Sequence, residues 1–151
     1  ENNTILILPI IKESKAIINP NLLEKYKDCK FTKKNTKLFI DSCKKILEFN
    51  KKGIELNFEI GSLVYSLILR IRGLLMIKLF HNNKHYSKNE LFIFLENNKI
   101  AKNKVEEFYS IYSKESDNKK VRESSIIKDE DTKQLISIAE SLLAELQSSF
   151  K

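Results

Sequence analysis

The sequence predicts an all-α protein: an up-and-down bundle of four to six helices around one buried central helix. Three observations lead to this prediction. Residues 61–80 form a run that is apolar on every side of a helical projection. The 151 residues include only three glycines and two prolines, so few positions break a helix. The segments on either side carry apolar residues at helical spacing. A central apolar helix enclosed by amphipathic helices is the pattern of a bundle.

The chain begins with a short apolar run over residues 4–11 that Pro9 interrupts. Proline is excluded from central strands, so we expect a short extended segment. Asn19 is a good N-cap and Pro20 suits the first helical position, which predicts a short helix to about Tyr26. We therefore divide the chain into an N-terminal arm with a short helix, residues 1–30, and a helical bundle, residues 31–151.

The bundle is expected to open with a helix from Lys34 to Gly53, where glycine provides a C-terminal cap. Its apolar stripe falls at spacings of 1, 4, 3 and 1 residues. Cys43 lies on this stripe, which favours a buried structural thiol over a reactive one. The stripe consists of Leu38, Phe39, Cys43, Ile46 and Leu47.

The central run, residues 61–80, is long enough to suggest a membrane span. Arg70 and Arg72 argue against it, because each arginine near the centre of a span costs roughly 2.5 kcal/mol or more. No second hydrophobic run accompanies it. We therefore expect a buried core helix, no membrane contact and a cytoplasmic location.

Three further helices are expected after the central one. Ser87 and Glu90 have the spacing of a capping box, which predicts a short helix through Leu95. A second helix is predicted over residues 103–112, followed by a polar, poorly periodic loop over residues 113–128. The acidic residues 129–131 favour a helix N-terminus, and a regular apolar stripe continues that helix to about Phe150.

Several pieces of this order resemble the HEPN superfamily, which consists of small all-α domains found with nucleotidyltransferases and in RNA-processing toxins. Residues 64–75, VYSLILRIRGLL, are similar to that family's central helix, with Arg72 on its arginine. His85 followed by Phe92 is similar to the histidine that opens the family's next helix. Residues 129–143 resemble its closing acidic turn and helix. The resemblance covers about residues 34–150.

The resemblance departs from the ribonuclease members at the motif that carries their chemistry. Those members have an arginine, four to six residues and then a histidine near the penultimate helix. Residues 106–118 contain neither residue type. The resemblance therefore implies the non-catalytic branch, whose members bind nucleotide or substrate beside a nucleotidyltransferase. The first residue is Glu1 rather than methionine, which would suit fusion behind such a transferase, although trimming explains it equally well.

The net charge is +7, and residues 129–151 are acidic, so the cationic excess lies in the rest of the chain. This is compatible with a phosphate-bearing partner, although a solvated surface is the commoner explanation. Arg70 and Arg72 are candidates for phosphate binding, since a partly desolvated guanidinium binds strongly. The alternative is that the two arginines pair with buried acids such as Glu55, Glu59 or Glu107, or extend to water.

His85 is a candidate base or phosphate contact, with a solvated or capping histidine as the alternative. His81 and His85 have no third metal ligand nearby. Tyr109 and Tyr112 with Phe108 would suit base stacking, although helical spacing is more typical of a core. Lys119, Lys120 and Arg122 are candidate contacts to a nucleic-acid backbone, with a solvated charge run as the alternative. No glycine-rich phosphate loop, zinc set or Ser-His-Asp arrangement is present, so we expect no cofactor.

Taken together, these observations predict a non-catalytic HEPN-like binding domain that partners, or is fused to, a nucleotidyltransferase. It would bind nucleotide or RNA and form a homodimer through an exposed helix face. Two alternatives stay open. One is a metal-independent ribonuclease of toxin type that would use a non-standard pair such as Arg72 with His85. The other is a purely structural dimerisation domain.

Overall fold

The structure is a computed structural model that describes residues 30–116 and 127–150. Within this part of the chain it contains five helices and no strand, which confirms the all-α prediction. The predicted N-terminal arm, apart from residue 30, lies outside the described residues. The polar loop predicted over residues 113–128 is wrong at its start, because residues 113–116 are helical, and residues 117–126 of it lie outside the described residues. The helices are α3 (Lys33–Glu55), α4 (Ile60–His81), α5 (Lys88–Asn97), α6 (Lys102–Ser116) and α7 (Asp129–Ser149).

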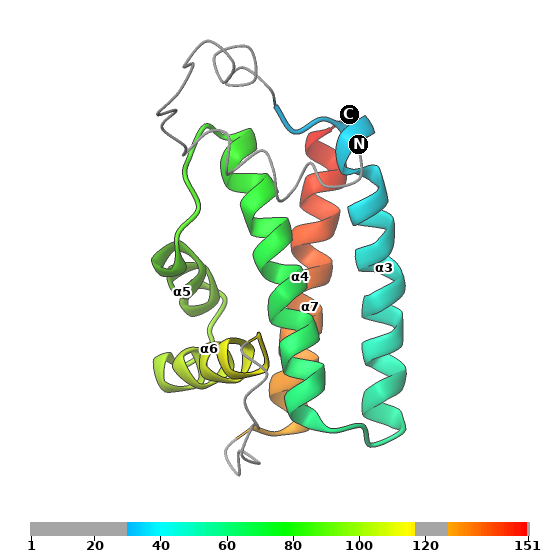
Figure 1. Cartoon of the computed structure of the whole chain (residues 1–151), viewed down its shortest axis with the longest axis vertical. Coiled ribbons are helices and arrows are strands. Elements are labelled where there is room, and N and C mark those ends of the chain that lie inside the picture. The colour runs from blue at the N-terminus through cyan, green and yellow to red at the C-terminus, as the bar shows by residue number, and fades with distance from the viewer. Residues whose placement is uncertain (1–29, 117–126, 151) are drawn as a thin grey trace, which may run out of the picture.

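Helix α4 is the centre of the bundle, as its composition predicts. Twelve of its residues are buried, and it packs against α3, α6 and α7 (Figure 1). Among the described helices only α4 is long and apolar enough to cross a membrane, and 56% of its most apolar window is buried inside the protein. Burial on this scale is expected of a core helix that neighbouring helices cover on several sides.

Helix α3 begins with reciprocal capping between two side chains and two backbone amides. The hydroxyl of Thr32 accepts from the amide of Asn35 at 3.3 Å, and Asn35 Oδ1 accepts from the amide of Thr32 at 2.8 Å. The predicted cap at Gly53 is wrong: the helix continues to Glu55, and Gly53 lies buried inside it. A Cβ at Gly53 would lie 2.8 Å from a methyl carbon of Leu63, so glycine allows α3 and α4 to approach closely there.

The predicted apolar stripe of α3 is also partly wrong. Cys43 and Leu47 are buried as predicted, but Leu38 is 66% exposed, and Phe39 and Ile46 are only partly buried. The inward side of α3 is instead completed by polar residues. Thr36 donates to the backbone oxygen of Thr32 at 2.7 Å, and Asn50 donates to Ser66 of α4 at 3.1 Å. These hydrogen bonds allow polar side chains to occupy interior positions that the hydropathy pattern assigns to apolar ones.

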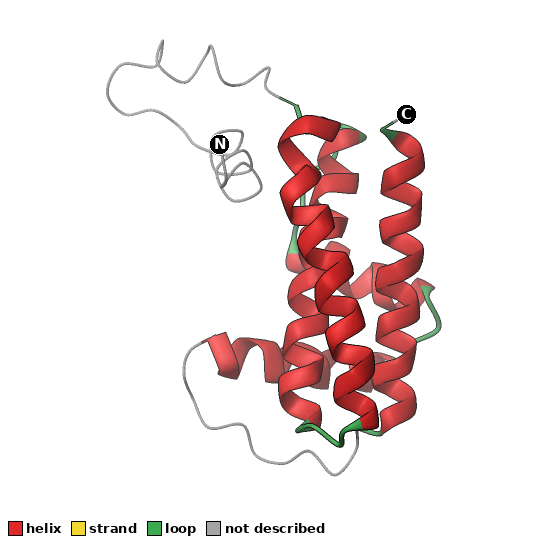
Figure 2. Cartoon of the chain, turned by 90° about the vertical axis from the view of Figure 1, so that its right-hand side faces the viewer, coloured by secondary structure: helices red, strands yellow, loops and turns green. Residues whose placement is uncertain are grey.

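Helices α5 and α6 are short and form a second layer beside α4. Ser87 caps α5 by accepting from the amide of Glu90 at 3.2 Å, which is one half of the predicted capping box. The return contact from Glu90 to the amide of Ser87 is absent from the described residues. Both helices lie on the left of α4 in Figure 1, and α6 runs across the long helices rather than along them (Figure 2). This layer packs on the core through five buried apolar side chains, which are Leu91, Leu95, Val105, Phe108 and Ile111.

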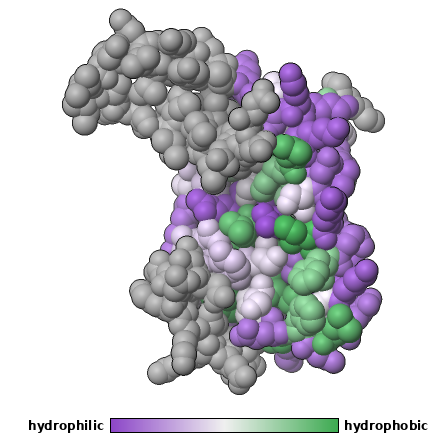
Figure 3. All heavy atoms as spheres, turned by 45° about the vertical axis from the view of Figure 1, so that its right-hand side comes forward, coloured by the Kyte–Doolittle hydropathy of each residue, from purple (hydrophilic) through white to green (hydrophobic). Residues whose placement is uncertain are grey.

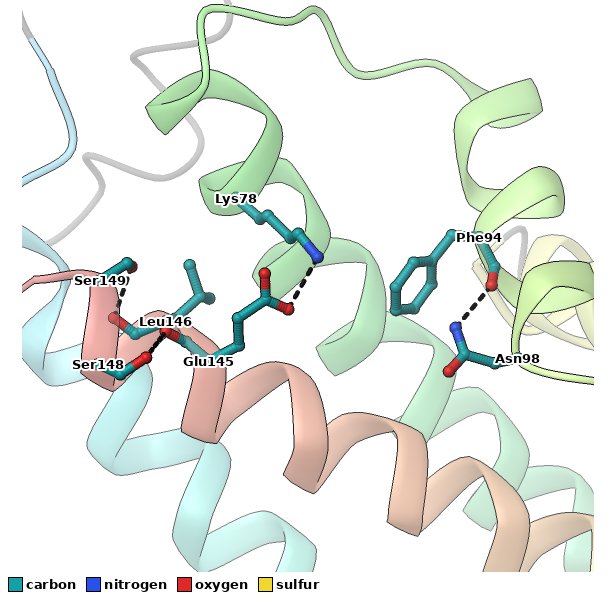
Figure 4. A network of polar contacts seen from close by, with 7 residues as sticks. All are labelled: Lys78, Phe94, Asn98, Glu145, Leu146, Ser148 and Ser149. Atoms are coloured by element: carbon teal, nitrogen blue, oxygen red, sulfur yellow. Dashed lines mark hydrogen bonds and ion pairs between the residues drawn. The ribbon is translucent and has the colours of Figure 1, made fainter.

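Helix α7 completes the bundle and runs in the same direction as α4. Its end lies beside the end of α4, where the rings of Phe150 and His81 are 5.1 Å apart. Between them Lys78 of α4 reaches Glu145 of α7 at 2.8 Å, as Figure 4 shows. Helices α5 and α6 lead the chain from the end of α4 back to the level at which α4 begins. Helix α7 starts there, and it therefore runs parallel to α4 (Figure 1).

Candidate functional site

Arg72 is a partly buried cation at the boundary between α4 and the α5–α6 layer. Its Nη1 donates to the phenolic oxygen of Tyr112 in α6 at 2.5 Å. Its guanidinium carbon also lies 5.5 Å from the ring centre of Tyr86 and 5.8 Å from that of Tyr112. Tyr86 belongs to the segment between α4 and α5, so three parts of the chain meet at this one side chain. Contacts of this length are cation–π interactions.

Further rings surround this arginine. Tyr65, seven residues before Arg72 on α4, stacks on Tyr112 with ring centres 5.7 Å apart and an interplanar angle of 19°. Tyr109 contacts Tyr112 at 5.8 Å, and Phe92 of α5 meets Tyr109 edge-on at 5.4 Å. All these rings are only partly buried. We call the aromatic cluster and its two cations the Arg72 site; it consists of Tyr65, Arg72, Tyr86, Lys88, Phe92, Tyr109 and Tyr112.

Lys88 is the second cation of the site and is exposed. It is the first residue of α5, where the Ser87 cap fixes the start of the helix. Its Nζ lies 4.3 Å from the ring centre of Tyr109 and 5.1 Å from that of Phe92. The site therefore combines an exposed ammonium and a partly buried guanidinium, both resting on aromatic rings.

Among the described residues no carboxylate pairs with Arg72. Lys78 pairs with Glu145, and Lys104 pairs with Asp131. The acids proposed from the sequence as partners of the arginines are engaged elsewhere or exposed. Glu59 accepts from Ser62 at 2.9 Å, and Glu55 is exposed. Glu107 is partly buried, and the charges that act on its pKa are those of Asp131 and Lys104 rather than of an arginine. The guanidinium of Arg72 is partly desolvated, and its contacts are uncharged phenols and ring faces. An anion that binds there would therefore gain a strong charge-assisted interaction.

The ionisation states at the site keep it cationic. Burial raises the pKa of Tyr86, and the charge and hydrogen bond of Arg72 offset only part of that rise. The phenol therefore stays protonated around neutral pH. Burial alone would lower the pKa of Arg72, but Tyr112 and Tyr86 outweigh it, and the net change is upward. The guanidinium is consequently charged whenever the protein is folded.

Arg70 does not belong to this site. Two positions along an α-helix correspond to a rotation of about 200° around its axis, so Arg70 and Arg72 project from different sides of α4. The charge of Arg70 acts on Cys43 of α3, whose pKa burial raises to about 12 despite that charge. The Nε atom of Arg70 is buried and has no hydrogen-bond partner among the described residues. We predicted from the sequence that both arginines could bind phosphate, but in the structure they lie in different surroundings.

His85 is exposed and adjacent in the chain to Tyr86. Its ring meets Phe80 edge-on with ring centres 6.1 Å apart. Lys119, Lys120 and Arg122 lie outside the described residues. Within the part of the chain that the structure describes, no three His, Cys, Asp or Glu side chains gather as a metal site.

Sequence reasoning identified Arg72, Tyr109 and Tyr112 but missed four members of the site. Tyr65 could have been found, because seven residues bring it to the same side of α4 as Arg72. Tyr86, Lys88 and Phe92 give no such signal. They join the site only because α5 packs on α6, and that contact is not encoded in any local pattern.

No family model, no curated protein and no solved structure matches the chain. The resemblance to HEPN domains therefore stays a prediction, and the functional argument depends on the geometry of the Arg72 site.

Proposed function

We propose that this protein is a binding domain for a phosphate-bearing aromatic ligand, either a free nucleotide or a nucleotide unit of single-stranded RNA, and that the ligand binds at the Arg72 site. One observation carries the proposal: a partly buried arginine lies among tyrosines and has no described carboxylate partner. The guanidinium would bind the phosphate and the rings would stack on the base.

The chemistry of the site matches that ligand in two respects. Aromatic side chains beside arginine or lysine are the usual platform for unpaired bases, because every base has a face that can stack. Lys88 would add a second phosphate contact at the exposed edge. The resemblance to HEPN domains independently singles out Arg72. A nucleotidyltransferase as the partner that uses the bound ligand follows from that resemblance alone.

The test is fluorescence anisotropy with a labelled single-stranded RNA of about twelve nucleotides, in a salt series, with ATP as competitor. We expect Arg72→Met to weaken binding about tenfold or more, the scale of losing one cation and its stacked base. Lys78→Met is the matched control, because it removes a cation from the same helix, and its affinity should stay within about twofold of the wild type.

Each outcome has a definite meaning. Competition by ATP at a concentration similar to that of RNA nucleotides would identify a free nucleotide as the ligand, and a strong salt dependence without competition would identify an RNA strand. Equal binding by Arg72→Met and wild type, or no binding by the wild type, would overturn the proposal. RNA cleavage that is lost in His85→Ala would instead assign the protein to the ribonuclease class.

A further inference from the structure

Helix α3 carries an exposed apolar face that the rest of the described protein does not cover. Leu38 is 66% exposed and Phe49 is 58% exposed. Eleven residues separate them, which is close to three helical turns and about 16 Å. At the end of the helix, Leu56 and Phe58 of the α3–α4 turn are 66% and 41% exposed. The rings of Phe49 and Phe58 contact each other with centres 5.7 Å apart, so the apolar surface continues from the helix onto the turn.

The large size of these side chains makes the face unusual. Single exposed apolar residues are normal on any protein, but contiguous apolar surface bordered by polar residues marks an interaction site. On the side of the molecule that includes α3, Figure 3 shows apolar surface bordered by hydrophilic surface. We define the α3 face as Leu38, Phe49, Leu56 and Phe58.

A row of lysines borders this face. At 100° per residue, Lys34, Lys45 and Lys52 project next to Leu38 and Phe49 on the surface of α3. All three are exposed, and no described carboxylate pairs with them. The acid Glu48 pairs with Lys51 further round the helix. Acids also lie along this border, because Asp41 and Glu48 are one helical turn from Lys45, and Glu48 and Glu55 are one turn from Lys52. The surface of α3 is nevertheless cationic in sum, since the helix carries seven lysines and three acids.

We propose that the α3 face is a docking surface for an acidic amphipathic helix of a partner protein. The apolar side of such a helix, with residues at spacings of three and four, would pack on Leu38 and Phe49. Its flanking aspartates and glutamates would face Lys34, Lys45 and Lys52. Complementary charge of this kind selects the partner and its direction, and apolar burial supplies the affinity.

The same charges argue against the other occupants. In a symmetric dimer through this face, each lysine row would approach its own copy, and like charges would repel. Nucleic acid would match the lysines and the rings of Phe49 and Phe58, but it would leave the more exposed Leu38 and Leu56 in contact with water. A helix that is both apolar and acidic matches both features.

The experiment uses the full chain and two labelled synthetic peptides of about eighteen residues. One is an amphipathic helix with leucines on one side and glutamates beside them, and the other has the same leucines with lysines in place of the glutamates. Binding is measured by fluorescence anisotropy. We expect the acidic peptide to bind at least tenfold more tightly than the basic one, and Lys45→Glu combined with Lys52→Glu to abolish or reverse this preference.

Phe49→Ser tests the apolar part of the surface, and Ile93→Ser is its matched control. Ile93 of α5 is 44% exposed and lies outside the α3 face, so both variants remove a large exposed apolar side chain. Far-ultraviolet circular dichroism should show that both fold. We expect Phe49→Ser to weaken the acidic peptide about tenfold and Ile93→Ser to change it less than twofold.

Several results would overturn the proposal. Equal binding of the two peptides would mean that the face binds apolar helices without selecting their charge. No binding by the wild type would mean that no acidic helix docks there. A dimer in light scattering that Phe49→Ser dissociates would assign the face to a second copy. Loss of RNA binding in Phe49→Ser would assign it to nucleic acid. The Arg72 site plays no part in peptide binding or in dimer formation, so those two readouts test this proposal separately from the proposed function. For RNA binding, Arg72→Met measured beside Phe49→Ser shows which of the two surfaces the RNA uses.

Discussion

Lys78 and Arg72 lie six residues apart on α4, and the side chains that surround the two cations differ. The long-helix region is formed by α3, α4 and α7. Lys78 pairs with Glu145 of α7 at 2.8 Å, and on its other side the ring of Phe94 of α5 lies 5.9 Å away (Figure 4). Arg72 faces the α5–α6 layer and meets tyrosines instead of a carboxylate. Lys78 is therefore paired with an acid, whereas Arg72 has no described carboxylate partner. Unpaired polar atoms also occur among the long helices, because Arg70 Nε, Asn50 Oδ1 and Thr132 Oγ1 are buried without a hydrogen-bond partner among the described residues.

This difference indicates which region maintains the fold and which region is available for binding. Natural proteins satisfy local rules of packing and pairing almost everywhere, and the exceptions are concentrated at functional or strained sites. In the long-helix region, apolar side chains such as Leu74, Leu135 and Leu142 are almost completely buried. In the α5–α6 layer, the rings and cations of the Arg72 site are partly buried or exposed. Mutations in the two regions should therefore differ in what they damage.

The largest expected effect comes from the core. Leu74→Ala removes a fully buried side chain at the centre of the long-helix region, where neighbouring helices cannot close the cavity. We expect the free energy of unfolding to fall by about 4–5 kcal/mol, the upper half of the range for such substitutions. Leu91→Ala in α5 is equally buried but lies in the thinner layer, which can relax, so about 2–3 kcal/mol is expected.

Urea denaturation followed by circular dichroism measures both values. If Leu91→Ala costs as much as Leu74→Ala, the two layers are equally rigid and the distinction between a structural region and a binding region loses its physical basis. If Leu91→Ala also broadens the transition, the α5–α6 layer unfolds separately from the long helices.

The second effect concerns the contact that joins the two regions. Asp131, at the start of α7, accepts from Lys104 of α6 and, at 2.9 Å, from the backbone amide of Lys128. Burial alone would raise the pKa of Asp131, but these two hydrogen bonds outweigh burial and lower it. A lowered pKa means that the carboxylate stabilises the fold above its ordinary pKa of 3.8, and that this contribution is lost as the pH falls through the folded-state value.

We therefore expect Asp131→Asn to lower the free energy of unfolding at pH 7 by about 1–3 kcal/mol, the scale of a charged hydrogen bond. The difference from the wild type should shrink as the pH falls below about 4. Asp129→Asn makes the same change in the same turn at an exposed position and is the control. Thermal denaturation from pH 7 to pH 3 measures the trend. A difference that persists unchanged at pH 3 would show that Asp131 acts through packing rather than charge.

Much of the fold could be predicted because its main elements obey local rules. Helix α4 is recognisable from its apolar residues on all sides, and α7 from its regular stripe of Leu135, Ile138, Leu142 and Leu146 after three acids. Helix α3 could not be oriented correctly. Its interior includes Thr36 and Asn50, while Leu38 and Phe49 lie outside, and hydropathy alone assigns these residues the opposite way. Hydrogen bonds that exist only in the packed state, such as that between Asn50 and Ser66, decide the orientation.

The candidate site was predictable only in part for a related reason. A charge within an apolar run, such as Arg72, is visible in the sequence because burying it has a cost. That same signal also pointed to Arg70, whose guanidinium is directed towards α3. The two rings that contact Arg72 come from α6 and from the segment between α4 and α5, and no local pattern relates these parts of the chain to α4. Tertiary packing therefore determined which of the two arginines has an aromatic environment.

The smallest expected effect on stability gives the sharpest test of the comparison. Lys78→Met removes an ion pair whose side chains are 29% and 54% exposed, so we expect a loss of about 0.5–1 kcal/mol that diminishes in high salt. Arg72→Met removes a partly buried cation without a described counter-ion and places an adaptable apolar chain among tyrosine rings. The hydrogen bond to Tyr112 is lost, but the desolvation cost of the guanidinium is removed too. We therefore expect the free energy of unfolding to change by less than about 1 kcal/mol in either direction while ligand binding is lost. A loss above about 2 kcal/mol for Arg72→Met would mean that the fold requires this cation, and the contrast between the two regions would then be one of packing alone.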